Sequence, residues 1–446
     1  MKTSSQHETP RHLTTQNDKV FLSLFSRIQR FLPRLAGQKA FQGYLSTIDQ
    51  GFISLANFAA AILLARAVDP TEFGTYSVGF LLIHCVRAIQ DGLIVQPLNA
   101  FGASLSLKRF RRYFSANAVL QFILALASAV SAAVLGWLLI VTGNDTAGPT
   151  LLALWFAFLT WQMQEFLRRA FYTRGEVAKA AVNTTLTNAA RLGLMIWWME
   201  AGWLDTGIDG LNAIAWGSLA GLLLGLWQAR PYWTRRGVTV LGAWKRNWRY
   251  GRWVLGGSLT NWAAVEVYPI IAAGMVNFAA AGAYRALQTL VAPVHLLLRA
   301  LDTFSTPWAA KEYHQNGRAG LGRLVKIMYL VAGIPIVGWL LLINFFSIPL
   351  LRLLYQETYL PYSNGAIWMA LFYGLLYAYW PMQVAHKALR ATRPLFLANG
   401  AAIVSMFTIG ILAVRHWGLY GAIGGQALNA LIVTVVLWLS WRVGRK

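Results

Sequence analysis

The chain alternates between long apolar runs and short polar joints along almost its whole length. A run of about 20 apolar residues is long enough to cross a bilayer as a helix. The alternation predicts twelve spans, near residues 42–65, 73–97, 113–141, 150–171, 178–199, 208–229, 252–275, 283–307, 324–346, 362–385, 395–414 and 420–441. We therefore expect an all-α integral membrane protein with twelve transmembrane helices.

The residues ahead of the first span follow a different pattern. Residues 1–19 are polar, and from Val20 to Leu35 apolar residues recur at helical spacing while Arg27 and Arg30 lie off the apolar stripe. This arrangement is typical of a basic amphipathic helix in the membrane interface, with a linker as the alternative. The expected organisation is a cytoplasmic tail carrying this helix, a first six-helix bundle, a basic cytoplasmic linker and a second six-helix bundle, at residues 1–40, 41–230, 231–251 and 252–446.

Composition agrees with the membrane class. Of the 446 residues, 57% are hydrophobic and only 12% are charged, and the mean hydropathy is +0.47. A soluble domain is about one quarter charged, so this chain has too little polar surface to cover a globule in water. Cys85 is the only cysteine, which rules out an intramolecular disulfide and a cysteine zinc site.

The net charge of +23 would also suit a nucleic-acid-binding protein, but its distribution argues against that partner. With the N-terminus inside, 32 of the 39 Lys and Arg fall in alternate loops and the two tails, and only Arg66, Arg352 and Arg415 fall in the opposite loops. This bias predicts that both termini are cytoplasmic. Asp69 and Glu72 are expected to offset Arg66 locally. The tryptophans among the basic residues of the longest inner loop, 230–251, indicate an anionic lipid headgroup as a partner.

Two of the polar joints resemble each other when the sequence is shifted by 208 residues. The stretches ARAVDPTEFGTYS (65–77) and AGMVNFAAAGAYR (273–285) share an Ala, a Val, a Gly and a Tyr at equivalent positions. The joints connect spans 1–2 and 7–8, so the pattern indicates two halves of six spans with the same orientation, although chance similarity between interfacial turns is the alternative. Transporters built from parallel repeats bind their substrate between the halves.

The first joint also carries a family resemblance. The stretch NFAAAILLARAVDPTEFGTYSVGF (57–80) resembles the first-span signature of bacterial polysaccharide flippases: a helix ending in Leu-Ala-Arg, an acid–proline turn, and an aromatic-Gly-x-Tyr that opens the second helix. The stretch HWGLYGAIGGQAL (416–428) is similar to the start of the last helix in that family. The family is the polysaccharide transport branch of the multidrug/oligosaccharidyl-lipid/polysaccharide (MOP) exporter superfamily, and the resemblance extends from about residue 41 to the end.

The resemblance implies a fold and a function. Such proteins have two parallel-oriented six-helix bundles around a central cavity and work by alternating access. The usual cargo is a polyprenyl-pyrophosphate-linked oligosaccharide, moved across the bacterial inner membrane for O-antigen or capsule synthesis alongside other polysaccharide-assembly membrane proteins. The matched residues are small, aromatic and turn-forming, so the resemblance transfers no substrate-binding residue to this chain.

Charged residues inside the predicted spans are the candidate site. A charge in hydrocarbon costs about 3 kcal/mol on insertion scales, so each needs a partner or a wet cavity. An Arg guanidinium is a permanently charged fork for phosphate oxygens, and an acid could bind H⁺ or Na⁺ as the coupling ion. We expect the cavity charge from Arg87, Arg191, Arg285 and Arg299, and ion coupling or charge pairing from Asp49, Asp91, Glu266 and Asp302.

The alternative is that these charges are salt bridges that fix helix packing. Arg87 and Asp91 are four residues apart and can pair along one helix face, and Arg299 and Asp302 are three apart on the equivalent span of the second half. Snorkelling toward the interface is the alternative for Arg285. Glu165, which is followed by Arg168 and Arg169, is interpreted as an interfacial ion pair.

Other functions are less consistent with the sequence. It contains no H-E-x-x-H, no P-loop and no G-x-S-x-G, so neither a metal cofactor nor an ATPase motor is expected, and the protein is not expected to be an enzyme. A cation-coupled multidrug antiporter of the same superfamily would have a more acidic cavity. A membrane glycan polymerase or ligase would need a long external loop, whereas every external loop here is short.

Overall fold

The computed structural model describes residues 38–389 and 391–443. The amphipathic helix predicted between Val20 and Leu35 lies outside the described residues. The chain divides after Ile48 into two compact units. In the first unit, the described residues form the opening turns of helix α2, and all packing reported below concerns the second unit, which begins at Asp49.

The described residues are almost entirely helical and contain no strand, which confirms the all-α prediction. Six of the helical stretches are long and apolar enough to cross a membrane. A π-helix (Asp91–Val95) joins α3 to α4 and another (Met406–Gly410) joins α13 to α14. The helices are α2 (Gln38–Ala67), α3 (Pro70–Gln90), α4 (Gln96–Gly102), α5 (Leu107–Val141), α6 (Ala147–Thr173), α7 (Val177–Glu200), α8 (Gly207–Gln228), α9 (Val240–Met275), α10 (Phe278–Leu290), α11 (Ala292–Tyr355), α12 (Gly365–Ala388), α13 (Thr392–Ser405) and α14 (Ile411–Val443).

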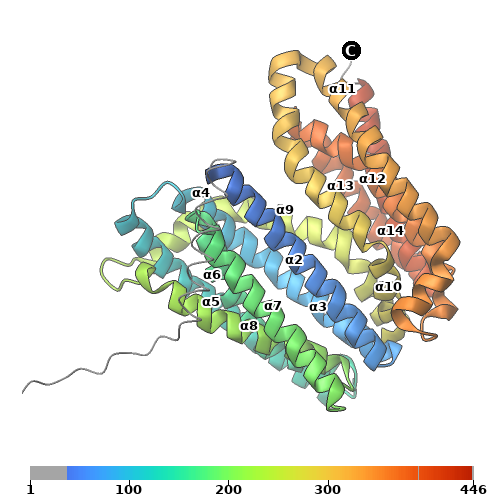
Figure 1. The fold of residues 1–446 in the computed structure, drawn as a ribbon, viewed down its shortest axis with the longest axis horizontal. Coiled ribbons are helices and arrows are strands. Elements are labelled where there is room, and N and C mark those ends of the chain that lie inside the picture. The colour runs from blue at the N-terminus through green and yellow to red at the C-terminus, as the bar shows by residue number, and fades with distance from the viewer. Residues whose placement is uncertain (1–37, 390, 444–446) are drawn as a thin grey trace, which may run out of the picture. The chain divides into compact units, whose positions relative to one another are not determined.

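Helix packing follows chain order within each half. Helices α5, α6, α7 and α8 pack against one another in sequence, and α11, α12, α13 and α14 do the same. Figure 1 shows the first set in cyan to green and the second in orange to red. Helix α9 contacts both sets, through α5 and α14, and it also contacts α3. Helix α10 packs along α3 and contacts α11, α12 and α14. Any site between the two halves is therefore bordered by α3, α9 and α10.

The segment 230–251, which the sequence analysis places in a loop, is partly helical. A short 3₁₀ turn occupies Arg230–Tyr232, and α9 already begins at Val240. Asn247 explains the earlier start, because its buried side chain accepts a hydrogen bond from the Tyr113 hydroxyl (2.6 Å) and donates one to Asn117 on α5 (2.7 Å). Tertiary hydrogen bonds thus extend α9 into a polar segment for which hydropathy alone predicts a loop.

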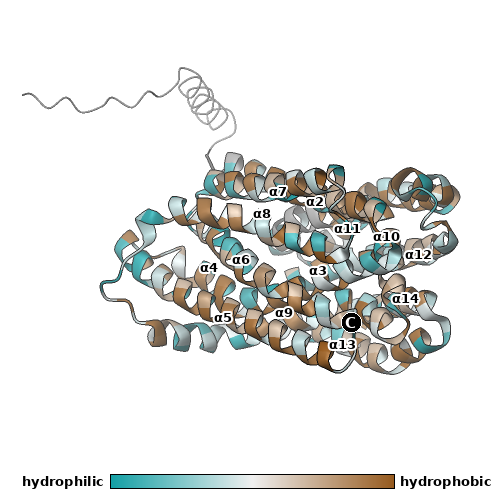
Figure 2. Ribbon diagram, turned by 90° about the horizontal axis from the view of Figure 1, so that it is seen from below, coloured by the Kyte–Doolittle hydropathy of each residue, from teal (hydrophilic) through white to brown (hydrophobic). Residues whose placement is uncertain are grey.

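Apolar side chains are distributed as lipid contact requires. From Phe122 onward, the buried face of α5 consists of small residues such as Ala125, Ala129 and Gly136, while the large residues Phe122 and Leu126 are exposed. A Cβ at Gly136 would lie 2.6 Å from the backbone nitrogen of Leu152, so glycine is what lets α5 approach α6. Figure 2 shows hydrophobic residues along much of the helical ribbon. Small residues at the contact and large apolar residues outside are the pattern of a multi-pass membrane protein.

The two repeated joints begin their helices in the same way. The Asp69 carboxylate accepts hydrogen bonds from the backbone N–H groups of Thr71 (2.6 Å) and Glu72 (3.1 Å) at the start of α3. At the equivalent point of α10, the Asn277 amide oxygen accepts one from Ala280 (2.8 Å). Asp and Asn are equally good N-caps, which explains how the second joint can lack the charge.

The repeated glycines of these joints meet where α3 crosses α10. A Cβ on Gly74 would lie only 1.8 Å from the carbonyl oxygen of Phe278, and a Cβ on Gly282 would lie 2.2 Å from that of Pro70. Each glycine therefore makes room for the first turn of the other helix, and no larger residue fits without separating them.

The charges of the first joint do not neutralise one another as expected. Arg66 instead donates through Nε and Nη2 to the carbonyl oxygens of Leu354 (2.7 Å) and Leu353 (2.6 Å) at the end of α11. Glu72 accepts a hydrogen bond from the backbone N–H of Gly207 at the start of α8 (2.7 Å). The physical reason is that helix ends leave backbone groups unpaired, and these compete successfully for the charged side chains.

Candidate functional site

A cavity of about 180 Å³ lies between the two halves. Its walls come from α2 and α3 on one side and from α9, α10, α11, α12 and α14 on the other. Apolar and aromatic side chains, including Phe80 and Tyr373, make up part of the lining. The polar and charged lining residues are Ser54, Asn57, His84, Glu266, Arg285, Gln288, Thr289, His295 and Gln426. A mostly apolar wall with a few convergent polar groups is the usual form of a ligand site.

Arg285 is the cation of this cavity. Its guanidinium lies over the ring of Phe80, 5.2 Å from the centroid, and Nη1 donates to Oε1 of Gln288 (2.8 Å). Its Nε has no hydrogen-bond partner, and within the described residues Arg285 forms no ion pair. The charge is held by a π face and a neutral amide, so no acid among the described residues neutralises it and an anion in the cavity would be its counter-charge. The structure thus places Arg285 in the cavity, where the sequence analysis expected a cation.

Glu266 also lines the cavity, paired with a histidine from the other half. Oε2 of Glu266 on α9 lies 2.8 Å from Nδ1 of His84 on α3, and both side chains are about a quarter exposed, at 23% and 25%. His84 in turn packs against Phe80, with ring centroids 4.5 Å apart. This hydrogen bond links α9 to α3 across the cavity.

Arg191 lies behind the cavity wall. It is 5% exposed on α7, and its guanidinium donates to Oδ1 of Asn57 (2.8 Å) and to the hydroxyl of Tyr76 (2.5 Å). Both partners are neutral, so the cation is buried without an ion pair among the described residues. Asn57 lines the cavity, and because a guanidinium can only donate, it fixes the amide oxygen of Asn57 toward α7. Arg191 therefore acts on the cavity through Asn57.

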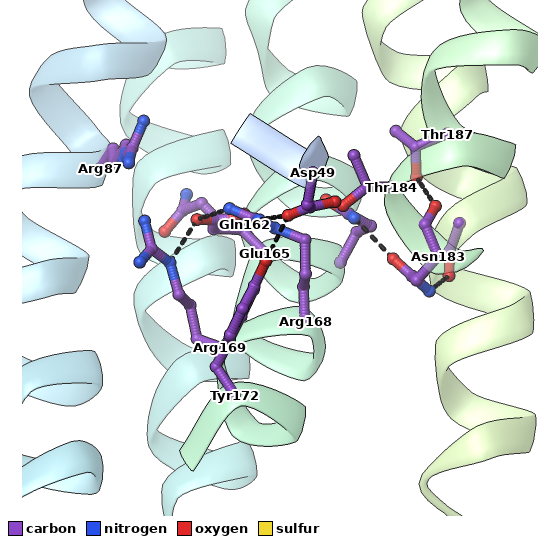
Figure 3. Close-up of polar contacts among 12 residues, drawn as sticks. Asp49, Arg87, Gln162, Glu165, Arg168, Arg169, Tyr172, Asn183, Thr184 and Thr187 are labelled. Carbon is purple, nitrogen blue, oxygen red and sulfur yellow. Dashed lines mark hydrogen bonds and ion pairs between the residues drawn. The ribbon is translucent and has the colours of Figure 1, made fainter. Parts of the chain in front are cut away.

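A buried ion network of Asp49, Glu165, Arg168 and Arg169 joins α2 to α6 (Figure 3). Arg168 bridges the two acids, with Nη1 3.0 Å from Oδ2 of Asp49 and Nε 2.7 Å from Oε2 of Glu165. Nε of Arg169 donates to Oε1 of Glu165 (2.7 Å), and the Tyr172 hydroxyl donates to Asp49. The ion pair predicted for Glu165 is confirmed, but it is buried within the protein, with Glu165 and Arg168 each 4% exposed.

Arg87 and Asp91 form a separate pair along α3 and the following π-helix. Nε of Arg87 lies 3.7 Å from Oδ2 of Asp91, and the side chains are 33% and 25% exposed. Neither residue lines the cavity. In the buried ion network two acids balance two arginines, and Arg87 and Asp91 balance each other. These charges compensate one another locally, as ion pairs that fix helix packing do.

Arg299 and Asp302 lie on α11, but their side chains fall outside the described part of the structure. Their assignment to the cavity stays a prediction.

The residues 42–311 match the family of polysaccharide biosynthesis proteins. The match covers more than half of the chain. The chain belongs to this family.

Solved structures place the family member in the MOP transporter fold. An inward-facing multidrug resistance MATE transporter of the MOP superfamily aligns over 88% of this chain and 94% of its own at 14% identity, with a TM-score of 0.69. An outward-facing MATE transporter aligns over 92% and 95% at 13% identity, with a TM-score of 0.62. The lipid II flippase MurJ in an inward closed conformation aligns over 90% and 87% at 13% identity, with a TM-score of 0.64. No curated protein matches the sequence.

The uncharged residues that line the cavity were not predicted from the sequence. Asn57, Phe80 and Gln288 carry no charge, so they were not among the charged residues predicted within the spans. Gln288 had a usable signal, because it lies one turn after Arg285 and therefore on the same helix face. His84 and Asn57 had none, because their role depends on how α2, α3 and α9 come together.

Proposed function

We propose that this protein translocates a polyprenyl-pyrophosphate-linked oligosaccharide across the bacterial inner membrane, for the synthesis of a cell-surface polysaccharide. The observation that carries the proposal is Arg285, a cavity cation with no acidic partner among the described residues. The planar guanidinium fork matches the geometry of phosphate oxygens, so a pyrophosphate is a suitable counter-charge. Membership of the polysaccharide biosynthesis family supports the same class of cargo.

The rest of the cavity suits the sugar part of that cargo. Asn57, Gln288 and Gln426 offer amide groups for sugar hydroxyls, and Phe80 and Tyr373 offer ring faces. MurJ, which shares the fold, is described as a lipid II flippase. A cationic drug would meet the positive charge of Arg285, so the multidrug antiporter is the weaker alternative.

We propose that the protein works by alternating access between two bundles of six transmembrane helices each, with both termini in the cytoplasm. Every residue of α3 from Phe73 to Leu81 is buried, whereas Leu82, His84 and Val86 are partly exposed. The end of the helix pair α3/α10 that the charge pattern assigns to the outside is thus packed shut, and the other end is looser. This asymmetry corresponds to a state that opens toward the cytoplasm.

We propose that Glu266 is the site of ion coupling and that the ion is H⁺. Asp49 already has Arg168 as its counter-charge, so a bound cation would compete with a buried guanidinium. Glu266 instead pairs with His84, whose imidazole is not a permanent counter-charge as a guanidinium is. Because the two residues come from α9 and α3, a proton shared between them is positioned to respond to movement of one half against the other.

The test is deletion of the gene followed by extraction of lipid-linked intermediates. We expect polyprenyl-linked repeat units to accumulate on the cytoplasmic face, and the wild-type chain to clear them. Arg285→Gln should fail to clear them, whereas Arg415→Gln, which removes an exposed arginine from an outer joint, should complement like wild type. An unchanged pool of intermediates with intact surface glycan after deletion, in a strain with no second flippase, would contradict the proposal.

A further inference from the structure

A second pocket, of about 460 Å³, lies between α11 and the last turns of α14, away from the central cavity. Its wall is formed by one face of α11 together with Trp441. Three of its six lining residues are cations: Arg318, Arg323 and Lys326. None of the six is acidic, so the pocket has a single sign of charge.

The cations of this pocket are not neutralised by a neighbouring acid. Arg318, Arg323 and Lys326 form no ion pair within the described residues. Glu312, the nearest acid along α11, accepts a hydrogen bond from Asn316 (2.7 Å) and lies against Gly320 rather than in the pocket. The local field is therefore positive, and an anion is the complementary ligand.

The floor of the pocket is an aromatic ring held in place by the protein. Trp441 is only 5% exposed, and the Arg318 guanidinium lies 5.5 Å from its ring centroid. A Cβ at Gly322 would make only an ordinary contact, 3.9 Å from Cζ2 of Trp441. The Arg318 guanidinium is held over the ring by a cation–π interaction.

The pocket lies at the depth of a headgroup layer. It follows the last apolar turns of α14, which ends at Val443, and precedes the long apolar part of α11 that begins after Lys326. Trp and Arg or Lys together are typical of this boundary between hydrocarbon and water. Arg323 and Lys326 are exposed there, within reach of lipid phosphates.

We propose that this pocket binds the phosphate headgroup of an anionic phospholipid, at a site separate from the transport cavity. Basic pockets between transmembrane helices at the cytoplasmic boundary bind headgroups of this kind. A headgroup with two phosphates fits three cations better than one with a single phosphate, so cardiolipin should bind more tightly than phosphatidylglycerol. The proposal does not depend on which cargo the central cavity carries.

Native mass spectrometry of the full-length protein in detergent tests it, with cardiolipin, phosphatidylglycerol and phosphatidylethanolamine as probes. We expect retention in that order. The triple variant Arg318→Gln/Arg323→Gln/Lys326→Gln should lower cardiolipin affinity by roughly a hundredfold, because each cation near the headgroup contributes about fivefold. Arg318→Lys, which keeps the charge but loses the planar fork, should lose less.

The matched control is Lys108→Gln/Arg109→Gln/Arg112→Gln, which removes three exposed cations from the same predicted membrane face in the first half. This control should keep wild-type affinity for cardiolipin. Equal loss in both triple variants would overturn the proposal, because it would reduce the effect to net charge. Equal retention of phosphatidylethanolamine and cardiolipin by the wild type would also overturn it, as would displacement of bound cardiolipin by millimolar inorganic pyrophosphate.

Discussion

Adding one methyl group where α3 crosses α10 should push the protein out of the state in which these helices touch. A Cβ at Gly74 would lie 1.8 Å from the Phe278 carbonyl oxygen, against at least 3.4 Å for an ordinary contact, so the Gly74→Ala variant must separate the helices by roughly 1.5 Å. Overpacking of this kind costs about 1–3 kcal/mol. The cost applies only while the contact exists, so the population of the state in which the helices are apart should rise about 5- to 150-fold.

Cysteine accessibility measures that population. In a Cys85→Ala background, Ala292→Cys places a single thiol on the cavity wall, and a membrane-impermeant maleimide is applied from outside the cell. We expect Gly74→Ala to increase the labelling rate by at least several fold. Gly282→Ala should have a smaller effect, because its Cβ would be 2.2 Å rather than 1.8 Å from the nearest carbonyl oxygen.

The control is Gly274→Ala, at a glycine with nothing within 4 Å of the added methyl group, which should leave the labelling rate unchanged. If Gly74→Ala reaches the membrane in normal amounts and labels at the wild-type rate, then the contact between α3 and α10 does not separate during transport. The reasoning would also be refuted if the thiol became more accessible only from the cytoplasmic side, because the packed end would then face inward.

Three further outcomes follow from the polar contacts. Arg191→Lys should weaken substrate binding roughly tenfold or more, since it removes a charged hydrogen bond to Asn57 worth about 1.5–3 kcal/mol. Transport kinetics should show the weaker binding as a raised apparent KM. Adding Asn57→Ala to the Arg191→Lys variant should raise the KM little further. Arg66→Gln should raise outside labelling by up to about 30-fold, because it loses two hydrogen bonds to the end of α11, each worth about 1 kcal/mol. Glu165→Gln should destabilise the protein by about 3–5 kcal/mol in a thermal-melt assay. Adding Arg169→Gln should restore part of the loss, because Arg169 pairs with Glu165 while Arg168 keeps its ion pair with Asp49.

The sequence predicted the helices well and the site only in part. Hydropathy located the spans because each must be apolar over a fixed length, a local property that needs no knowledge of neighbours. Hydropathy did not predict that α9 begins as early as Val240, because this start depends on hydrogen bonds between Asn247 and residues on α5. Arg285 and Arg191 look alike in the sequence, as single cations in apolar runs, yet one lines the cavity and the other lies behind its wall. That difference depends on how the helices pack.

The two repeated joints share a backbone turn although only the first one carries charged residues. Both joints need an N-cap and a glycine, and Asp69 with Gly74 or Asn277 with Gly282 supply them equally well. Arg66, which has no counterpart in the second joint, extends from α2 and donates a hydrogen bond to the end of α11, in the other half. Glu72 instead accepts a hydrogen bond from the start of α8, in its own half. Of the charges that distinguish the two joints, Arg66 is thus the one that links the two halves at this end.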